Sequence, residues 1–122
     1  MAIIYYDAED FCNVSQASFP LTISVKIGDG QGGGYLIFNG IDLISTNAPG
    51  TIHSINEADQ WVTVAVTVKD KLLETNWTSM TVYLQNANQE ERIKFGPYKK
   101  EVPQHLDTVC YTLQLKLNKL EL

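Results

Sequence analysis

Residues 19–27 read FPLTISVKI, and along this stretch apolar and polar side chains alternate with a period of two. The same alternation returns at residues 62–69 (VTVAVTVK) and at residues 109–117 (VCYTLQLKL). A β-strand turns successive side chains to opposite faces, so the pattern predicts strands with one buried side and one solvent-facing side. The fold is therefore expected to be built from β-sheets.

The segments between these runs are short, and none has a convincing helical pattern. We expect one all-β domain over residues 1–122, an antiparallel β-sandwich of seven or eight strands, with a small β-barrel as the alternative. Residues 1–18 are expected to be irregular or partly helical, because Asp7 is suited to cap a helical turn that runs through Phe11 and Val14. The long strand at residues 108–118 is expected to close the domain.

The dipeptide Asn39-Gly40 lies between the apolar runs at residues 35–38 and 41–44. This arrangement is typical of a hairpin with a two-residue type I′ turn, which would set Phe38 and Leu36 on the core face. Gly96-Pro97 and Pro103 are expected to bracket a loop around Lys99, because proline is poorly tolerated in a paired strand. The predicted core consists of Leu21, Ile23, Val25, Leu36, Phe38, Val62, Val64, Val66, Val82, Leu84, Leu113 and Leu115.

The chain has 9 Lys and Arg residues against 14 Asp and Glu residues, for a formal net charge of −5. A negative protein is repelled by nucleic acid and by anionic membranes, so neither is an expected partner. No apolar run is long enough to cross a bilayer. The N-terminus lacks signal-peptide features, so localisation stays open: cytoplasmic if Met1 is the native start, otherwise a secreted domain without its signal. Cys12 and Cys110 allow one disulfide or two free thiols.

Motifs for catalysis and metal binding are weak. Neither His53 nor His105 has another ligand at a recognised metal-binding interval, and there is no G-x-S-x-G elbow. The G-x-G-x-x-G spacing within residues 28–33 is followed by a strand pattern, whereas a nucleotide-binding loop needs a helix there. A calcium site would draw on Asp7, Glu9, Asp10 and Asp29, which do not follow an EF-hand spacing. We expect no enzyme, no cofactor and no metal.

Aromatic residues outside the alternating core are the best candidates for binding. Trp77 lies in a polar connection, Trp61 shares the outward register of Thr63, and Tyr98 lies in the expected loop, with the glycine-rich residues 28–34 as an adaptable rim. The leading hypothesis is a non-catalytic binding or interaction module that recognises a protein or carbohydrate partner through loop aromatics and strand edges. A structural domain that self-associates into a homo-oligomer by edge pairing of its long last strand is the alternative. An enzyme with an unmarked loop site comes third.

Overall fold

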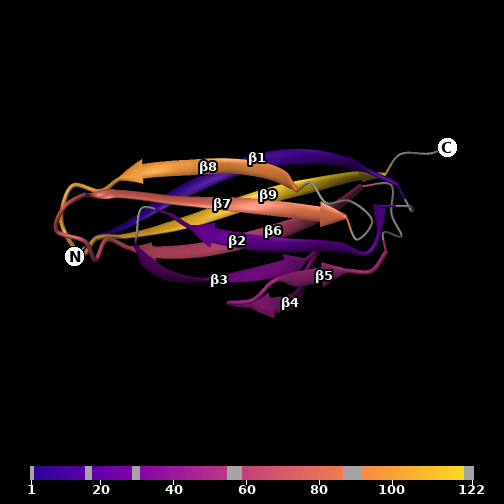
Figure 1. The fold of residues 1–122 in the computed structure, drawn as a ribbon, viewed down its shortest axis with the longest axis horizontal. Helices are drawn as coiled ribbons and strands as arrows, with labels where there is room; N and C mark the ends of the chain where they lie inside the picture. Colours follow the sequence, from indigo (N-terminus) through magenta and orange to yellow (C-terminus); the bar gives the residue numbers. More distant parts are fainter. Residues whose placement is uncertain (1, 16–17, 29–30, 55–58, 87–91, 120–122) are drawn as a thin grey trace.

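The computed structural model describes residues 2–15, 18–28, 31–54, 59–86 and 92–119. These residues form two β-sheets and no α-helix, and the sheets do not close into a barrel (Figure 1). The predicted all-β sandwich is confirmed. The strands are β1 (Ile3–Val14), β2 (Leu21–Ile27), β3 (Gly32–Asn39), β4 (Asp42–Thr46), β5 (Gly50–Ile52), β6 (Asp59–Lys69), β7 (Trp77–Asn86), β8 (Ile93–Glu101) and β9 (Thr108–Lys119).

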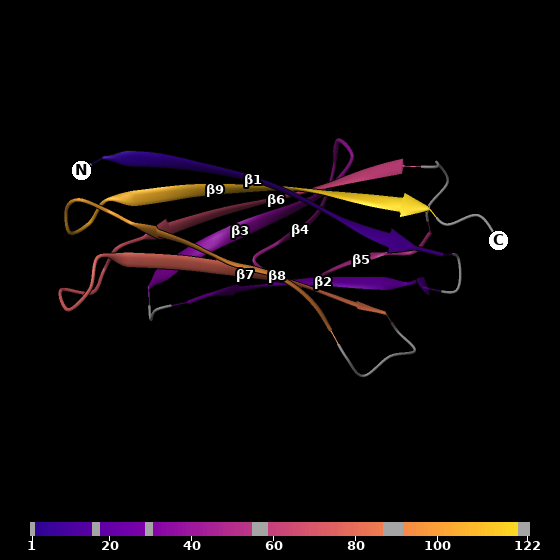
Figure 2. The same cartoon turned by 90° about the horizontal axis from the view of Figure 1, so that it is seen from above.

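The two sheets differ in size and lie face to face. The five-stranded sheet has the order β1-β9-β6-β3-β4, and the four-stranded sheet has the order β5-β2-β7-β8. Figure 2 shows the two layers, with β9 and β6 in one and β7 and β2 in the other. β8 meets β1 where Tyr98 packs against Tyr6, with ring centroids 6.2 Å apart, so the edge strands of the two sheets approach each other at this margin of the sandwich (Figure 1).

The first and last strands pair in parallel. The Cα partners run from Ile3 with Thr108 to Val14 with Lys119, and β6 pairs with the other side of β9. A parallel pair needs a long crossover, and the rest of the chain supplies it. Because β9 lies inside the sheet, the expectation that the last strand pairs with a neighbouring molecule through its edge is wrong.

Residues 3–14 form a strand of 12 residues, so the expectation of an irregular or partly helical segment over residues 1–18 is wrong for this part of it. Its even-numbered side chains face the core and its odd-numbered side chains are exposed. Two features conceal this alternation in the sequence. The inward position 10 carries a charged residue, Asp10, and the outward positions 5 and 11 carry Tyr5 and Phe11, which are 74% and 61% exposed.

The core lies between the sheets and is filled by aliphatic side chains. The even-numbered valines of β6 and the odd-numbered residues of β9 from Val109 to Leu117 are almost fully buried, and β2 and β7 cover them from the other sheet. Burying each such side chain contributes about 1.5–3 kcal/mol, which makes this layer the main source of stability. Ten predicted core residues are buried or packed against the core: Leu21, Ile23, Val25, Val62, Val64, Val66, Val82, Leu84, Leu113 and Leu115.

The β3–β4 hairpin differs from its expected register by one residue. Asn39 pairs with Asp42 and Phe38 with Leu43, so the turn is Gly40-Ile41, with a positive φ of 62° at Gly40. A positive φ at the first turn residue alone is what a type II′ turn requires. The face of β3 follows from its pairing with β6, in which Ile37 lies beside the buried Val64, whereas Leu36 and Phe38 lie beside Ala65 and Thr63. Ile37 is therefore the buried residue, and the expected core positions of Leu36 and Phe38 are wrong.

Two further segments that were expected to be loops belong to strands. Gly96-Pro97 lies inside β8 and forms a bulge there, because these two residues lie opposite the single residue between Met80 and Val82 of β7. An edge strand accepts proline because the missing N–H leaves no neighbouring strand unpaired. Residues 32–34 of the glycine-rich segment form the start of β3, whereas residues 29–30 lie outside the described part of the chain.

The two cysteines are free thiols on opposite faces of the five-stranded sheet. Cys12 is buried beside Leu117, and Cys110 lies on the outer side beside Tyr5. Seven residues of β9 separate these two positions, about 23 Å at ~3.3 Å per residue. A disulfide needs Cα atoms within about 7 Å, so the fold excludes this bridge.

Candidate binding surface

The outer face of the five-stranded sheet carries the side chains that point away from the core. The strand registers place these side chains in rows that cross the sheet from β1 to β3. Threonine, alanine and glycine occupy the middle of the face, and larger residues lie around them. The rows are Tyr5-Cys110-Thr67-Gly34, Asp7-Thr112-Ala65-Leu36, Glu9-Gln114-Thr63-Phe38 and Phe11-Lys116-Trp61.

Most of the exposed large apolar side chains gather on this face. Eleven such residues are exposed among those described, and seven of them lie on the five-stranded sheet or in its β3–β4 turn. Single exposed apolar residues are normal on a protein surface, so the informative feature is that most of them share one sheet. The seven are Ile3, Tyr5, Phe11, Leu36, Ile41, Leu43 and Trp61.

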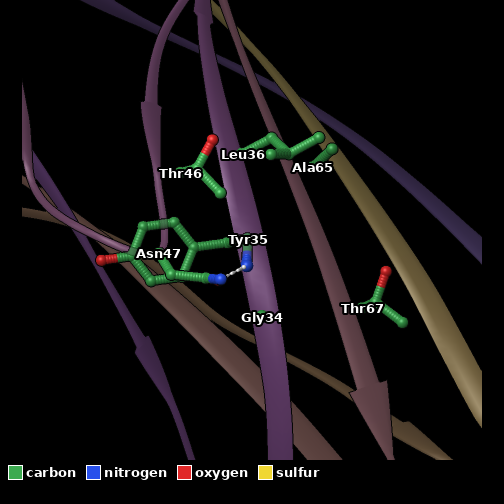
Figure 3. A pocket seen from close by; sticks show the side chains of 7 residues that line it. All are labelled: Gly34, Tyr35, Leu36, Thr46, Asn47, Ala65 and Thr67. Carbon is green, nitrogen blue, oxygen red and sulfur yellow. Dashed lines mark hydrogen bonds between the residues drawn. The ribbon is translucent and has the colours of Figure 1, made fainter.

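The face is hollowed in two places because its middle side chains are small. A hollow of about 500 Å³ lies over β1 and β9 and is lined by Asp7, Ala8, Glu9, Thr112 and Gln114. A second hollow of about 250 Å³ lies over β3, β4 and β6 (Figure 3). Its lining residues are Gly34, Tyr35, Leu36, Thr46, Asn47, Ala65 and Thr67.

Asn47 fixes one wall of the second hollow. Its backbone N–H donates to the Tyr35 carbonyl at 2.9 Å, and its side-chain Oδ1 accepts the Tyr35 N–H at 2.7 Å (Figure 3). Asn47 adopts a positive φ of 54°, which asparagine tolerates better than most residues. A Cβ atom on Gly34 would lie 2.7 Å from Asn47 Oδ1, so glycine is required for this approach.

Trp61 is the predicted binding residue that lies on this face. It is 43% exposed, and Nζ of Lys116 lies 5.9 Å from the centroid of its ring. Lys116 stands between Trp61 and Phe11 in the same row. A cation over an indole is attracted by the negative face of the ring, which holds the two side chains together.

Trp77 and Tyr98 lie elsewhere, so the three predicted binding residues do not form one site. Trp77 is 45% exposed at the start of β7 in the four-stranded sheet. Tyr98 lies in β8 and packs against Tyr6, with ring centroids 6.2 Å apart. Its hydroxyl donates to Asp10 Oδ2 at 3.4 Å, and burial, followed by the nearby Asp10 carboxylate, raises the pKa of Tyr98 to about 12.

The backbone of β1 forms the margin of this face, and it differs from the other edge strands. β4 has 5 residues and β5 has 3, so both offer short edges. β8 carries Pro97, a bulge and the exposed Lys94, Lys99 and Lys100, all of which discourage pairing. β1 has 12 residues without proline, glycine, lysine or arginine. Among the described strands it is the long edge without proline, a bulge or lysine, and its charged side chains are all acidic: Asp7, Glu9 and Asp10.

The hydrogen bonds at the start of β1 show which residues face outward. The Ala2 carbonyl accepts the Thr108 N–H at 2.9 Å, so even-numbered residues pair with β9 and odd-numbered residues direct their N–H and C=O groups away from it. Two of these outward groups have partners within β1. The Phe11 N–H donates to Asp10 Oδ1 at 2.9 Å, and the Cys12 thiol donates to the Asn13 carbonyl. Within the described structure, the edge from Ile3 to Glu9 stays open.

A buried polar cluster holds the start of this edge in place. Asp107 is 1% exposed, and its carboxylate accepts the Ala2 N–H at 2.8 Å and the Gln104 N–H at 3.0 Å. Gln31 donates to Asp70 Oδ1 and accepts the Lys71 N–H. These buried carboxyl and amide groups were not among the candidate residues, because in the sequence they resemble ordinary turn residues.

His105 lies at the rim of this cluster. Its Nδ1 is 4.0 Å from Oδ2 of the fully buried Asp70, and neither atom has a hydrogen-bond partner among the described residues. An Asp–His pair acts in catalysis when the imidazole also reaches a nucleophilic hydroxyl or thiol. In the described part of the chain, no serine, threonine or cysteine is hydrogen-bonded to His105.

The proposed calcium ligands do not converge. Asp7 and Glu9 point outward, Asp10 points inward, and Asp29 lies outside the described residues. No group of three or more His, Cys, Asp and Glu side chains suited to a metal occurs within the described ranges.

The same ranges contain no helix that is long and apolar enough to cross a membrane. Comparisons with protein families, with curated proteins and with solved structures found no match.

Proposed function

We propose that this protein is a non-catalytic interaction module that binds a partner protein on the outer face of its five-stranded sheet. We call this surface the docking face and define it by Tyr5, Phe11, Leu36, Leu43 and Trp61. The observation that supports the proposal is the gathering of seven of the eleven exposed large apolar residues on this sheet and its hairpin turn.

The chemistry of the docking face favours a protein over a sugar. Leu36 and Leu43 are aliphatic, and they gain most from an apolar partner surface that removes them from water. Trp61 and Tyr5 are large, partly polar aromatic residues of the kind enriched at interface hot spots. The threonines between them, such as Thr63, give the centre of the face hydrogen-bonding capacity without charge.

A carbohydrate is the second candidate, and the hollow over β1 and β9 favours it. Asp7, Glu9 and Gln114 supply acceptors and donors around about 500 Å³ of space. Tyr5 and Trp61 lie on the same face, and their rings are suited to stack on a sugar. This candidate makes no use of the aliphatic residues, which is why we place it second.

Selection from a display library of random peptides tests the proposal. Enriched peptides should bind the wild-type protein and lose at least tenfold in affinity on Trp61→Ala, about 1.4 kcal/mol. Leu73→Ala is the matched control, because Leu73 is 83% exposed but lies in the connection after β6. A glycan array probed with the same three proteins covers the second candidate. If neither library yields a ligand whose binding depends on Trp61, the docking face has no such role.

A further inference from the structure

We infer that the partner adds an extended, positively charged strand to the open edge of β1, alongside residues 3–9. This inference rests on the proposed function and specifies the chemistry of the partner. Three observations support it: the open backbone groups of β1, the charges that β1 carries, and the contacts at Asp10 that end the open stretch.

The pairing of β1 with β9 leaves every second residue of β1 with unpaired backbone groups over residues 3–9. Ile3, Tyr5, Asp7 and Glu9 direct their N–H and C=O groups away from β9. An extended peptide satisfies such groups by pairing with every second residue, and its side chains then continue the faces of the sheet. On the outer face, the added side chains would lie next to Tyr5 and the hollow lined by Asp7 and Glu9.

The charged side chains of β1 are all negative. Asp7, Glu9 and Asp10 are its ionisable acids, and the strand has no lysine or arginine. Opposite charges on directly paired residues stabilise a sheet, and like charges destabilise it. Two lysine or arginine side chains, placed two residues apart on the incoming strand, would meet Asp7 and Glu9 on one face.

The open stretch ends at a defined residue. Oδ1 of Asp10 accepts a hydrogen bond from the Phe11 N–H, and its Oδ2 accepts one from the Tyr98 hydroxyl of β8. The carbonyl of Asn13 accepts the Cys12 thiol. An added strand that continued past Glu9 would have to displace these contacts, so we expect pairing over about seven residues, from Ile3 to Glu9.

A second copy of the chain is a poor occupant of this edge. Two β1 strands side by side would bring a second Asp7, Glu9 and Asp10 to the same margin, and each molecule carries a net charge of −5. The carboxylates would lie opposite or diagonal to one another, where they repel. A different, basic segment meets no such repulsion.

The test uses a random-peptide display library selected in parallel on the wild-type protein and on its Tyr5→Pro variant. Proline at position 5 removes an N–H that points away from β9, so the ladder to β9 loses no donor. Peptides enriched on the wild-type protein should carry Lys or Arg at alternate positions. They should bind the Tyr5→Pro variant at least tenfold more weakly than the wild-type protein. The Tyr5→Ala variant measures how much affinity is lost when the ring alone is removed.

Charge variants and amide exchange complete the test without a proline. The selected peptides should bind the double variant Asp7→Asn, Glu9→Gln at least tenfold more weakly than the wild-type protein. Their affinity for the Glu101→Gln variant should be unchanged, because Glu101 is an exposed acid on β8. Binding of a selected peptide to the wild-type protein should slow amide exchange at Tyr5, Asp7 and Glu9. This readout keeps the inference testable if Tyr5→Pro does not fold.

The outcomes separate this inference from the proposed function. Peptides that need Trp61 but bind Tyr5→Pro and the charge variant equally well would refute strand addition and leave the docking face in place. Enriched peptides that are acidic or neutral, or a wild-type dimer abolished by Tyr5→Pro, would refute a cationic partner. A library that yields no peptide dependent on either Tyr5 or Trp61 would refute both.

Discussion

The hydroxyl of Tyr98 on β8 donates a hydrogen bond to Oδ2 of Asp10 on β1, 3.4 Å away across the margin where the edges of the two sheets lie together. The other oxygen of Asp10 accepts the Phe11 N–H. One inward carboxylate therefore ties the two sheets together and ends the open edge of β1.

The first prediction concerns the pH dependence of stability. The pKa of Tyr98 is raised to about 12 by burial and by Asp10, whereas an unfolded tyrosine has a pKa of about 10. Between these values the folded state holds a proton that the unfolded state releases, so the free energy of unfolding falls as pH rises from 10 to 12. Urea unfolding at pH 9 and pH 11.5 should show a smaller fall for Tyr98→Phe than for the wild-type protein. An equal fall in both proteins would show that the raised pKa of Tyr98 is not the cause of the pH dependence.

The second prediction concerns the support of β1 by Asp107. Asp107→Ala should lower the free energy of unfolding by roughly 2–4 kcal/mol, because the N–H groups of Ala2 and Gln104 lose a buried acceptor. Asp107→Asn should cost less, since its amide keeps one acceptor oxygen. Chemical denaturation measures both, with the exposed Asp42→Ala as the control, expected within about 0.5 kcal/mol of wild type. A similar loss of stability for Asp42→Ala would show that the removed negative charge, and not the buried hydrogen bonds, causes the effect.

The third prediction concerns the hydrogen bond between Thr78 and Tyr111. The Thr78 Oγ1 lies 2.6 Å from the Tyr111 hydroxyl and 2.7 Å from the Lys100 carbonyl, linking β7, β8 and β9 in the core. Tyr111→Phe should lower the free energy of unfolding by about 1–2 kcal/mol. The control is Tyr5→Phe, because the Tyr5 ring is 74% exposed. Thermal or urea unfolding distinguishes the two, and equal stability would show that this hydroxyl contributes nothing.

The fourth prediction concerns the reactivity of Cys12. Burial, followed by the nearby Asp10 carboxylate, raises the pKa of its thiol above the usual value, so little reactive thiolate forms near pH 8. In the Cys110→Ser variant, alkylation by iodoacetamide should be slow in the folded protein and fast in urea. Mass spectrometry follows the modification. Rapid labelling of the folded variant would mean that the C-terminal end of β1, where Cys12 lies, opens readily.

The sequence pattern predicts the sheets but not the register of every strand. Alternation over residues 62–69 and 109–117 identified β6 and β9 and correctly placed Trp61 outward. The buried face of β3 is not predictable locally, because Leu36, Ile37 and Phe38 are all apolar and either face of the strand would present apolar side chains to a core. Pro97 was misread because nothing local shows that β8 is an edge strand.

The candidate site depends on contacts between distant parts of the chain, which a local pattern does not contain. β1 pairs with a strand 105 residues away, as Ile3 with Thr108, and only that pairing makes β1 an edge. The same holds for Gln31, which contacts Asp70 39 residues later. The exposed aromatic residues were recognisable one by one, but their grouping on one face required the strand order.

Amide hydrogen exchange of the free protein, resolved by residue, shows whether the edge of β1 is open. We expect fast exchange at Tyr5, Asp7 and Glu9 and slow exchange at Tyr6 and Ala8, with the same rates at low and high protein concentration. Slow exchange at the odd-numbered residues, or protection that grows with concentration, would contradict an open edge, because the edge would then already be occupied by the protein itself.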